Sequence, residues 1–388
     1  MVPLSVLAGT FFTGGGSADL CALRADLEGF CMEEMGQLAM MVGAKEDQSN
    51  SISVGIDLGG TSLRVGAFDL AGRLLSNRSM RTRVADGPAE VVSDMAAAVR
   101  SILSELGIKV DGVGLGSPGP LNLQTGVLCE LPNFPGWSGF PLRDALSDEL
   151  QMEVVLESDA SAATLAEWKS GAGKAEGVDS MAMLTLGTGV GSGLILDGRV
   201  WSGMVGMGGE VGHVTVNPEG PECTCGGRGC LEMYASATGV LRSARAAAAM
   251  EQNPGLASLF RTGPNAGAHD VATLAEAGDP GALRIYADIG HYIGLSLAGL
   301  VNTLDLPLYV IGGGVAAAWG LFSPEMFLTL RRYSYVYRMS EPTQTLTREK
   351  NRPFVTPALL GPDAGLIGAA MLVGHSYTRS AEAVSQRG

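Results

Sequence analysis

Basic side chains are scarce in this chain of 388 residues, which has 26 lysines and arginines against 40 aspartates and glutamates, a formal net charge of −14. An acidic surface of this kind repels nucleic-acid backbones and anionic membranes. Long apolar runs are also missing, since no stretch has the roughly 18 uninterrupted apolar residues that are typical of a membrane-spanning helix. We therefore expect neither a nucleic-acid partner nor a membrane partner.

A basic segment ahead of an apolar run, the mark of a secretory signal, is lacking as well. Residues 1–12 are largely apolar, but the first basic side chain is Arg24, which lies beyond them. The six cysteines are not spaced as a disulfide framework, because three of them fall within the eight residues from Cys223 to Cys230. Such a cluster favours a metal site in a reducing compartment. We expect a cytoplasmic protein.

Glycine, in contrast, is abundant, with 56 residues that follow no collagen-like period. This predicts tight turns and places where the backbone approaches a ligand closely. Residues 1–50 carry only weak helical patterning and run into a polar linker from Lys45 to Ser51. We interpret them as a weakly ordered N-terminal extension, with a docking or regulatory role as the alternative.

The remainder of the chain repeats one pattern of elements. A strand, a glycine loop, a second strand and a hairpin are expected in residues 52–78 and again in residues 181–198. Helices alternate with the strands, which predicts an α/β fold with mixed sheets, a duplicated architecture and a ligand-binding cleft between the two halves. The helices are expected at residues 89–106, 159–169, 233–250, 271–278 and 280–304.

Two domains are expected from this pattern. A small α/β domain is placed at residues 51–165, and a closing C-terminal helix at residues 364–374 is assigned to it. A large α/β domain is placed at residues 166–363, with a buried strand at residues 307–311. The cysteine cluster falls in the large domain.

Three glycine-rich loops directly follow predicted strands, at Asp57–Thr61, Gly187–Gly191 and Gly312–Gly314. Without Cβ atoms, backbone N–H groups can approach an anion, so the loops predict binding of nucleotide phosphates. None has the Walker spacing or opens a Rossmann unit, which excludes both classes of nucleotide site. The residues expected at the ATP site are Asp57, which could hold Mg²⁺ through water, Gly59, Gly60, Thr61, Gly187, Thr188, Gly189, Gly191, Gly312, Gly313 and Gly314.

A metal site is predicted from His213 together with Cys223, Cys225 and Cys230. One imidazole and three thiolates make a closed tetrahedral set, which suits structural zinc and leaves no open position for catalysis. The alternatives are a chance group of buried or redox cysteines and, less favoured, a catalytic metal.

With these motifs in place, the chain resembles the ROK family (repressors, open reading frames and sugar kinases), particularly its bacterial glucokinases, within the actin-like ATPase superfamily. The resemblance covers about residues 52–374. It implies a pair of actin-like, ribonuclease H-like domains. The motifs that carry it are Asp57–Thr61, Gly116–Pro120, Leu131–Trp137, Leu186–Gly193, Gly209–His213, Cys223–Glu232 and Ile311–Gly314.

The resemblance also implies roles for single residues. Asp159 falls at the position of the catalytic base. The chain departs from the family pattern around it, because relatives typically read Glu-Asn-Asp-Ala-Asn where this chain has Glu157-Ser-Asp-Ala-Ser161. Ser158 is shorter than the asparagine that helps to hold the sugar, which leaves the identity of the sugar open. The residues implied at the sugar site are Gly119, Asn133, Ser158, Glu210, His213, which also binds zinc, and Glu232.

The expected function is ATP-dependent phosphorylation of a hexose, with glucose converted to glucose 6-phosphate, by a homodimer that uses Mg²⁺ and structural Zn²⁺. The first alternative is a kinase for N-acetylmannosamine, N-acetylglucosamine, fructose or allose. The second is a sugar-responsive repressor, such as some family members are. The first 50 residues disfavour it, because they hold only Arg24 and Lys45 as basic groups against seven acidic ones and cannot neutralise DNA phosphates.

Overall fold

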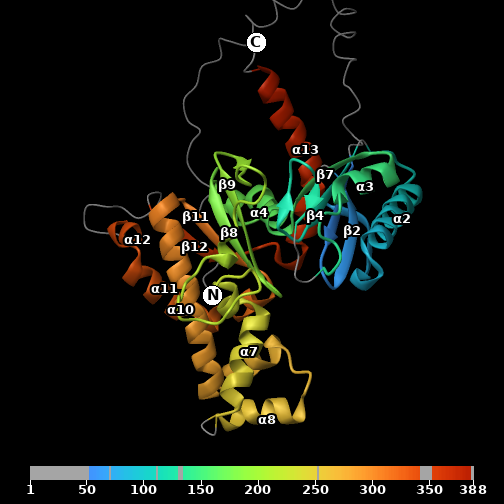
Figure 1. Ribbon diagram of the computed structural model, residues 1–388. Coiled ribbons are helices and arrows are strands. Elements are labelled where there is room, and N and C mark those ends of the chain that lie inside the picture. The colour runs from blue at the N-terminus through green and yellow to red at the C-terminus, as the bar shows by residue number, and fades with distance from the viewer. Residues whose placement is uncertain are drawn as a thin grey trace, which may run out of the picture. The chain divides into compact units, whose positions relative to one another are not determined.

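A computed structural model describes residues 52–385, except for residues 70, 111, 130–133, 251–252 and 341–351 (Figure 1). The expected N-terminal extension lies outside the described residues, and so does Asn133. In the part of the chain that is described, every helix is too short or too polar to cross a membrane.

Two mixed five-stranded sheets form the framework, and they have the same strand order. Three strands of each sheet are joined as antiparallel neighbours, and the remaining two add in parallel. The first sheet runs β3-β2-β1-β4-β7, and the second runs β10-β9-β8-β11-β12. The duplicated α/β architecture expected from the repeated motif is therefore confirmed. The strands of the first sheet are β1 Ser53–Leu58, β2 Ser62–Phe68, β3 Leu74–Arg81, β4 Gly112–Ser117 and β7 Glu153–Ser158; those of the second are β8 Met181–Leu186, β9 Val190–Leu196, β10 Arg199–Val200, β11 Leu308–Gly312 and β12 Phe354–Pro357.

The strands differ in how deeply they are buried. The central strands β4 and β11 are buried along their whole length, as expected for parallel strands covered on both faces. The edge strand β3 alternates between exposed and half-buried positions. The turn between β9 and β10 consists of Asp197 and Gly198, both with positive φ (49° and 72°). This is the geometry that a two-residue hairpin requires, so the hairpin signal is confirmed.

The helices begin and end largely where local signals place them. Pro88 opens α2 and Gly107, in the left-handed conformation, ends it. Asp279 caps α10 by accepting a hydrogen bond from Ala282 N. The single helix expected at residues 233–250 is split, because Ser236 adopts an extended conformation and caps a new helix. The helices are α2 Pro88–Leu106, α3 Leu142–Leu150, α4 Asp159–Ser170, α5 Ala172–Glu176, α6 Glu232–Ala235, α7 Ala237–Ala248, α8 Pro254–Thr262, α9 Ala268–Glu276, α10 Pro280–Leu304, α11 Trp319–Tyr333, α12 Tyr335–Met339 and α13 Ala364–Ser385.

Two helices cross between the halves. Helix α4 follows β7 of the first sheet but packs on β9 of the second, and α13 (red in Figure 1) follows β12 of the second sheet but packs on β1, β2 and β4 of the first. The two helices also pack on each other, so closely that a Cβ atom on Gly368 would lie 1.7 Å from the Ala162 carbonyl oxygen. Asp159, at the start of α4, therefore stands where the halves meet. The domain boundary at residue 165 falls inside α4, and the division into two domains stays a prediction.

Candidate active site and metal centre

A cavity of about 650 Å³ is lined by loops from both sheets. It brings together most of the predicted site residues, although they come from distant parts of the sequence. Among the other predicted residues, Gly314 lines a neighbouring cavity, whereas Asp57 and Gly312 line neither of the two. The predicted residues that line the main cavity are Gly59, Gly60, Thr61, Gly119, Ser158, Asp159, Gly187, Thr188, Gly189, Gly191, Glu210, His213, Glu232 and Gly313.

Asp159 is the first residue of α4 and is half-buried in the cavity wall. Ser158 caps the helix, since its Oγ accepts a hydrogen bond from Ser161 N at 3.1 Å, and Asp159 Oδ1 accepts one from Ala160 N at 2.7 Å. Enclosure by the protein raises the pKa of Asp159 to about 7, and the negative charges of Asp57 and Glu210 add to the shift, although the bond from Ala160 opposes it. A carboxyl group with a pKa near neutrality is suited to accept a proton from a substrate hydroxyl.

The first glycine loop is closed by backbone hydrogen bonds and leaves Gly60 facing open space. Gly59 N donates to Ser62 O at 2.9 Å, and Thr82, the residue after β3, holds the loop by donating from Oγ1 to Gly59 O at 2.6 Å. A Cβ atom on Gly60 would meet only the Phe134 ring, at 3.7 Å. The protein itself thus leaves room at Gly60, and a bound anion can approach the backbone there.

Asp57 lies behind this loop, at the end of β1. Its Oδ2 atom accepts hydrogen bonds from Arg64 Nε at 3.1 Å and Nη2 at 2.6 Å. Arg64 also donates to the carbonyl of Pro362, at the start of the segment that leads into α13, and a Cβ on Gly365 would lie 3.2 Å from the Asp57 carboxylate. The predicted contact of Asp57 with Mg²⁺ through water stays a prediction, and with Oδ2 held by Arg64 it would fall to Oδ1.

The second glycine loop is attached to Glu232. The Oε2 atom of Glu232 accepts a hydrogen bond from Val190 N at 2.9 Å, and a Cβ atom on Gly189 would lie only 2.3 Å from that oxygen. The loop is also bound to the start of α7, where Ala237 N donates to Gly187 O at 2.8 Å. A side chain at position 189 would therefore displace the Glu232 carboxylate, even without a bound ligand.

Glu210 approaches the first half of the molecule from the second. A Cβ atom on Gly119, in the loop after β4, would lie 3.3 Å from Glu210 Oε1. The Glu210 side chain is open to the cavity, and enclosure by the cavity walls raises its pKa; the nearby His213 lowers it, and Glu232 raises it further. Two carboxylates and one imidazole thus face the same space as Asp159.

The metal ligands predicted from the sequence do converge. One donor atom from each of His213, Cys223, Cys225 and Cys230 lies within 4.8 Å of all the others. The Cys223 Sγ–His213 Nδ1 distance is 3.7 Å and the Cys225 Sγ–Cys230 Sγ distance is 3.6 Å. Zinc–sulfur bonds of about 2.3 Å in a tetrahedral site place ligand atoms roughly 3.7 Å apart. The four donors therefore fit one tetrahedral metal ion.

Local turns explain how eight residues can supply three ligands to one ion. Gly226 and Gly229 have positive φ values of 87° and 63°, and Cys223 N donates to Gly227 O at 2.9 Å. Burial raises the pKa of the Cys230 thiol to about 12. A cation at the centre of the cluster would offset the cost of a buried thiolate. His213 links this cluster to the main cavity, because it also lines the cavity wall.

Some cavity residues are missing from the sequence prediction. Glu157 and Ser192 line the cavity, and the Ser192 hydroxyl donates to Gly209 O while accepting from Val211 N at 3.1 Å. Both residues stand inside motifs that the sequence singles out, so a signal was present. It was missed because the motif alone does not tell which of its side chains turn toward the cavity.

A neighbouring cavity of about 410 Å³ shares Gly187 and Thr188 with the main one. Its walls are largely small and apolar, with three of its lining alanines coming from helices α7 and α9. Tyr286 closes one side, where its hydroxyl donates to the Ala268 carbonyl. The mostly apolar lining suits a largely apolar group joined to one in the main cavity.

Two sheets of equal strand order, with glycine loops from both around a shared cavity, define the actin-like class of two-lobed α/β proteins. Within that class the chain belongs to the ROK family, whose family model matches residues 53–376. The family predicted from the sequence motifs is thus confirmed.

Comparison with individual proteins agrees with this placement. The chain is 36% identical over 324 residues to the glucokinase of Halalkalibacterium halodurans, covering 82% of this chain and 94% of that protein. It is 35% identical over 320 residues to the glucokinase of Thermotoga maritima, covering 82% and 96% respectively. A solved structure of a ROK family glucokinase from Streptomyces griseus, in complex with glucose and AMPPNP, matches with 31% identity and a TM-score of 0.68, covering 83% of this chain and 99% of that one.

Proposed function

We propose that this protein phosphorylates a hexose at the expense of ATP, with glucose as the preferred acceptor and Asp159 as the general base. The observation that carries the proposal is the position of Asp159, which lies in the same cavity as the two glycine loops and has a pKa raised to about 7. The names of the similar proteins support glucose and ATP as ligands, since they are glucokinases and one was solved with glucose and AMPPNP.

In the proposed reaction, Asp159 accepts the proton of a sugar hydroxyl, O6 in glucose, as that oxygen attacks the γ-phosphorus of ATP. The bond to the β–γ bridging oxygen breaks, and ADP leaves. Such a transfer depends mainly on positioning and on neutralising charge. The backbone N–H groups around Gly60 and Gly187 would hold the phosphates, and the neighbouring cavity, bounded by Tyr286, would hold the adenine.

Glu210 and Glu232 are proposed to accept hydrogen bonds from the sugar hydroxyls, with His213 and Gly119 beside them. Asn133, which lies outside the described residues, keeps its predicted role at the sugar. Ionised carboxylates accept stronger hydrogen bonds than neutral groups do. Glu232 leaves Oε1 for the sugar, because Oε2 accepts the bond from Val190 N.

His213, Cys223, Cys225 and Cys230 would hold one structural zinc ion, which supplies four bonds that fix the segment between Glu210 and Glu232. A closed set of four protein ligands leaves no position for substrate. The four metal-binding residues would therefore act indirectly, by holding the carboxylates of Glu210 and Glu232 at a constant separation. Mg²⁺, when bound with ATP, would neutralise phosphate charge.

The test is an ADP-release assay with purified protein over a panel of glucose, N-acetylmannosamine, N-acetylglucosamine, fructose and allose. We expect the highest kcat/KM with glucose and a product in which the phosphoryl group is on O6. A higher kcat/KM with another sugar would show that this sugar, and not glucose, is the preferred acceptor. The absence of ADP release with every sugar would reject the proposed kinase activity. Analytical ultracentrifugation tests the predicted homodimer.

A further inference from the structure

Glu157 is a buried carboxylate that the proposed reaction does not use. It is the penultimate residue of strand β7, two residues before Asp159, lines the cavity, and is only 7% exposed. Its two oxygens hold different parts of the molecule: Oε1 accepts from Ser158 N at 3.0 Å, and Oε2 accepts from the hydroxyl of Ser202 at 3.1 Å. A buried carboxylate is costly unless such bonds compensate it.

Ser202 belongs to the loop of residues 201–209, which leaves β10 of the second sheet and leads directly to Glu210. This loop returns on itself, because Gly208 N donates to Ser202 O at 2.8 Å. The Ser192 hydroxyl fixes its far end through the carbonyl of Gly209. Ser202 is therefore joined by one backbone hydrogen bond to the residues that directly precede Glu210.

The same loop has a second attachment to the first half of the molecule. Leu123 N donates to Val205 O at 3.2 Å, and Gln124 Nε2 donates to Met204 O at 3.1 Å. Both donors lie in the turn between β5 (Leu121–Asn122) and β6 (Val127–Leu128).

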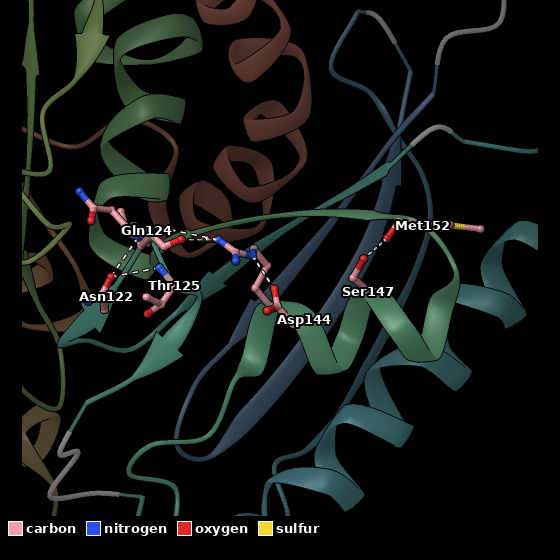
Figure 2. A network of polar contacts seen from close by, with 8 residues as sticks. Asn122, Gln124, Thr125, Asp144, Ser147 and Met152 are labelled. Carbon is pink, nitrogen blue, oxygen red and sulfur yellow. Dashed lines mark hydrogen bonds and ion pairs between the residues drawn. The ribbon is translucent and has the colours of Figure 1, made fainter.

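Figure 2 shows why this turn can serve as a fixed support. Asn122 Oδ1 accepts from Gln124 N and from Thr125 N, both at 3.1 Å. Arg143, from α3, donates to the carbonyl oxygens of Leu123 at 3.2 Å and Gln124 at 3.3 Å. The loop 201–209 is thus bound at one point to a rigid turn and at another to strand β7, which leads into Asp159.

We propose that Glu157 is a positioning residue, which through its hydrogen bond to Ser202 fixes the loop that leads to Glu210 relative to the β7–α4 junction that carries Asp159. The inference rests on the proposed function and assigns Glu157 no contact with the reacting atoms. Its consequence is that loss of the Glu157–Ser202 bond weakens sugar recognition, because Glu210 moves relative to Asp159. Nucleotide binding, which depends on the glycine loops, is left unchanged.

Ser202→Ala removes the bond and leaves the carboxylate in place. We expect KM for the sugar to rise about three- to tenfold, with little change in kcat or in KM for ATP, and Ser202→Thr, which keeps the hydroxyl, to restore the wild-type value. Ser147→Ala is the matched control, because Ser147 donates to Met152 O at 2.6 Å outside the cavity (Figure 2). It should leave KM for the sugar unchanged.

Glu157→Gln keeps the shape of the side chain and removes its charge. If Glu157 acts through Ser202, its effect on KM for the sugar should disappear in the Ser202→Ala background. Full additivity of the two substitutions would overturn the proposal. A parallel fall in kcat and rise in KM for ATP would overturn it too, since such changes indicate a general structural role.

Hydrogen exchange in the protein without sugar separates this inference from the proposed function. Ser202→Ala should speed amide exchange in residues 203–210 and leave the amides of Gln124 and Thr125 unchanged, because these donate to Asn122 Oδ1 and not to the loop. Unchanged exchange in residues 203–210 would reject the positioning role whatever the enzyme phosphorylates. If the wild type phosphorylated no hexose while exchange rose as expected, the proposed function would fail and the coupling between loop and strand would stand.

Discussion

The two halves of this protein share a strand order and differ in what their connections carry. In the first sheet, β3 is joined to β4 by a segment that contains helix α2 and no predicted site residue. In the second sheet, the corresponding connection between β10 and β11 extends from residue 201 to residue 307 and carries Glu210, the metal ligands and Glu232. The proposed base, Asp159, comes instead from the first half, at the β7–α4 junction. The duplicated framework supplies two glycine loops, and the long connection of the second half supplies the proposed sugar-binding carboxylates and the metal donor set.

The two glycine loops differ in the same way. Gly60 faces open space, with its nearest neighbour the Phe134 ring at 3.7 Å from a built Cβ, whereas Gly189 is packed against Glu232 at 2.3 Å. The same residue type thus leaves room for different groups: for the proposed ligand at Gly60, and for a protein carboxylate at Gly189. The following predictions test this division between the halves.

The largest effect is expected at the base. Asp159→Asn should lower kcat by at least about 10²-fold, because the proton acceptor is lost while shape is retained. Binding of the sugar, measured directly by calorimetry, should change little. Asp148→Asn, at an exposed position of α3, is the control. Near-normal turnover of a folded Asp159→Asn protein would show that Asp159 is not the general base.

Loss of the metal should affect the second half specifically. Purified protein should contain about one zinc ion per chain, and Cys225→Ser should lower the zinc content, lower the melting temperature by about 5 °C or more, and raise KM for the sugar. Cys129→Ser, at a cysteine outside the cluster, should do none of these. A metal-free protein with unchanged stability and sugar affinity would contradict a structural zinc.

The glycine loops can be separated by matched substitutions. Gly189→Ala should displace Glu232 and raise KM for the sugar about tenfold or more, because the added Cβ would overlap its carboxylate. Gly60→Ala should leave stability unchanged and raise KM for ATP, because the added methyl group stands where phosphate approaches. Equal effects of both substitutions on both KM values would show that the loops do not differ in role.

The pH profile reports on the charges around the base. Because the pKa of Asp159 is raised to about 7, kcat/KM should fall about tenfold per pH unit below pH 7 and level off above it. Glu210 is one of the charges that raise this pKa, so Glu210→Gln should move the midpoint to lower pH as well as weaken sugar binding. A midpoint near pH 4 in the wild type would show that the cavity does not perturb Asp159.

The smallest effect is expected at Ser158, on KM for glucose. Ser158 lines the cavity, and its hydroxyl accepts a hydrogen bond from Ser161 N. Ser158→Asn keeps a side chain that can cap α4 and adds an amide with longer reach. We expect KM for glucose to fall about 2- to 12-fold, the value of one neutral hydrogen bond. An unchanged or higher KM would move another sugar ahead of glucose.

Much of the fold and site could be predicted because their signals are local. The glycine loops, the Asp197-Gly198 hairpin, the capped helix α10 and the spacing of the three cysteines each depend on neighbouring residues. The strands β4, β7 and β12 and the helices α3, α5, α8, α11 and α12 were not predicted. Most of these elements are short, β4 is buried along its whole length, and α11 contains Pro324, a residue that disfavours a helix interior. The break of the 233–250 helix was missed because serine can occupy a helix interior or cap a new helix.

The sequence by itself determined the family, the duplicated strand pattern and the metal donor set, since each depends on residue types at fixed spacing. Tertiary structure decided the rest. Helices α4 and α13 each pack on the opposite sheet, and this packing places Asp159 of the first half close to Glu210 of the second. The folded structure also places Arg64 against Asp57. It also raised the pKa of Asp159, since enclosure and neighbouring charge are properties of the assembled cavity. Contacts between residues far apart in the chain depend on how helices and sheets pack, and no local spacing records that packing.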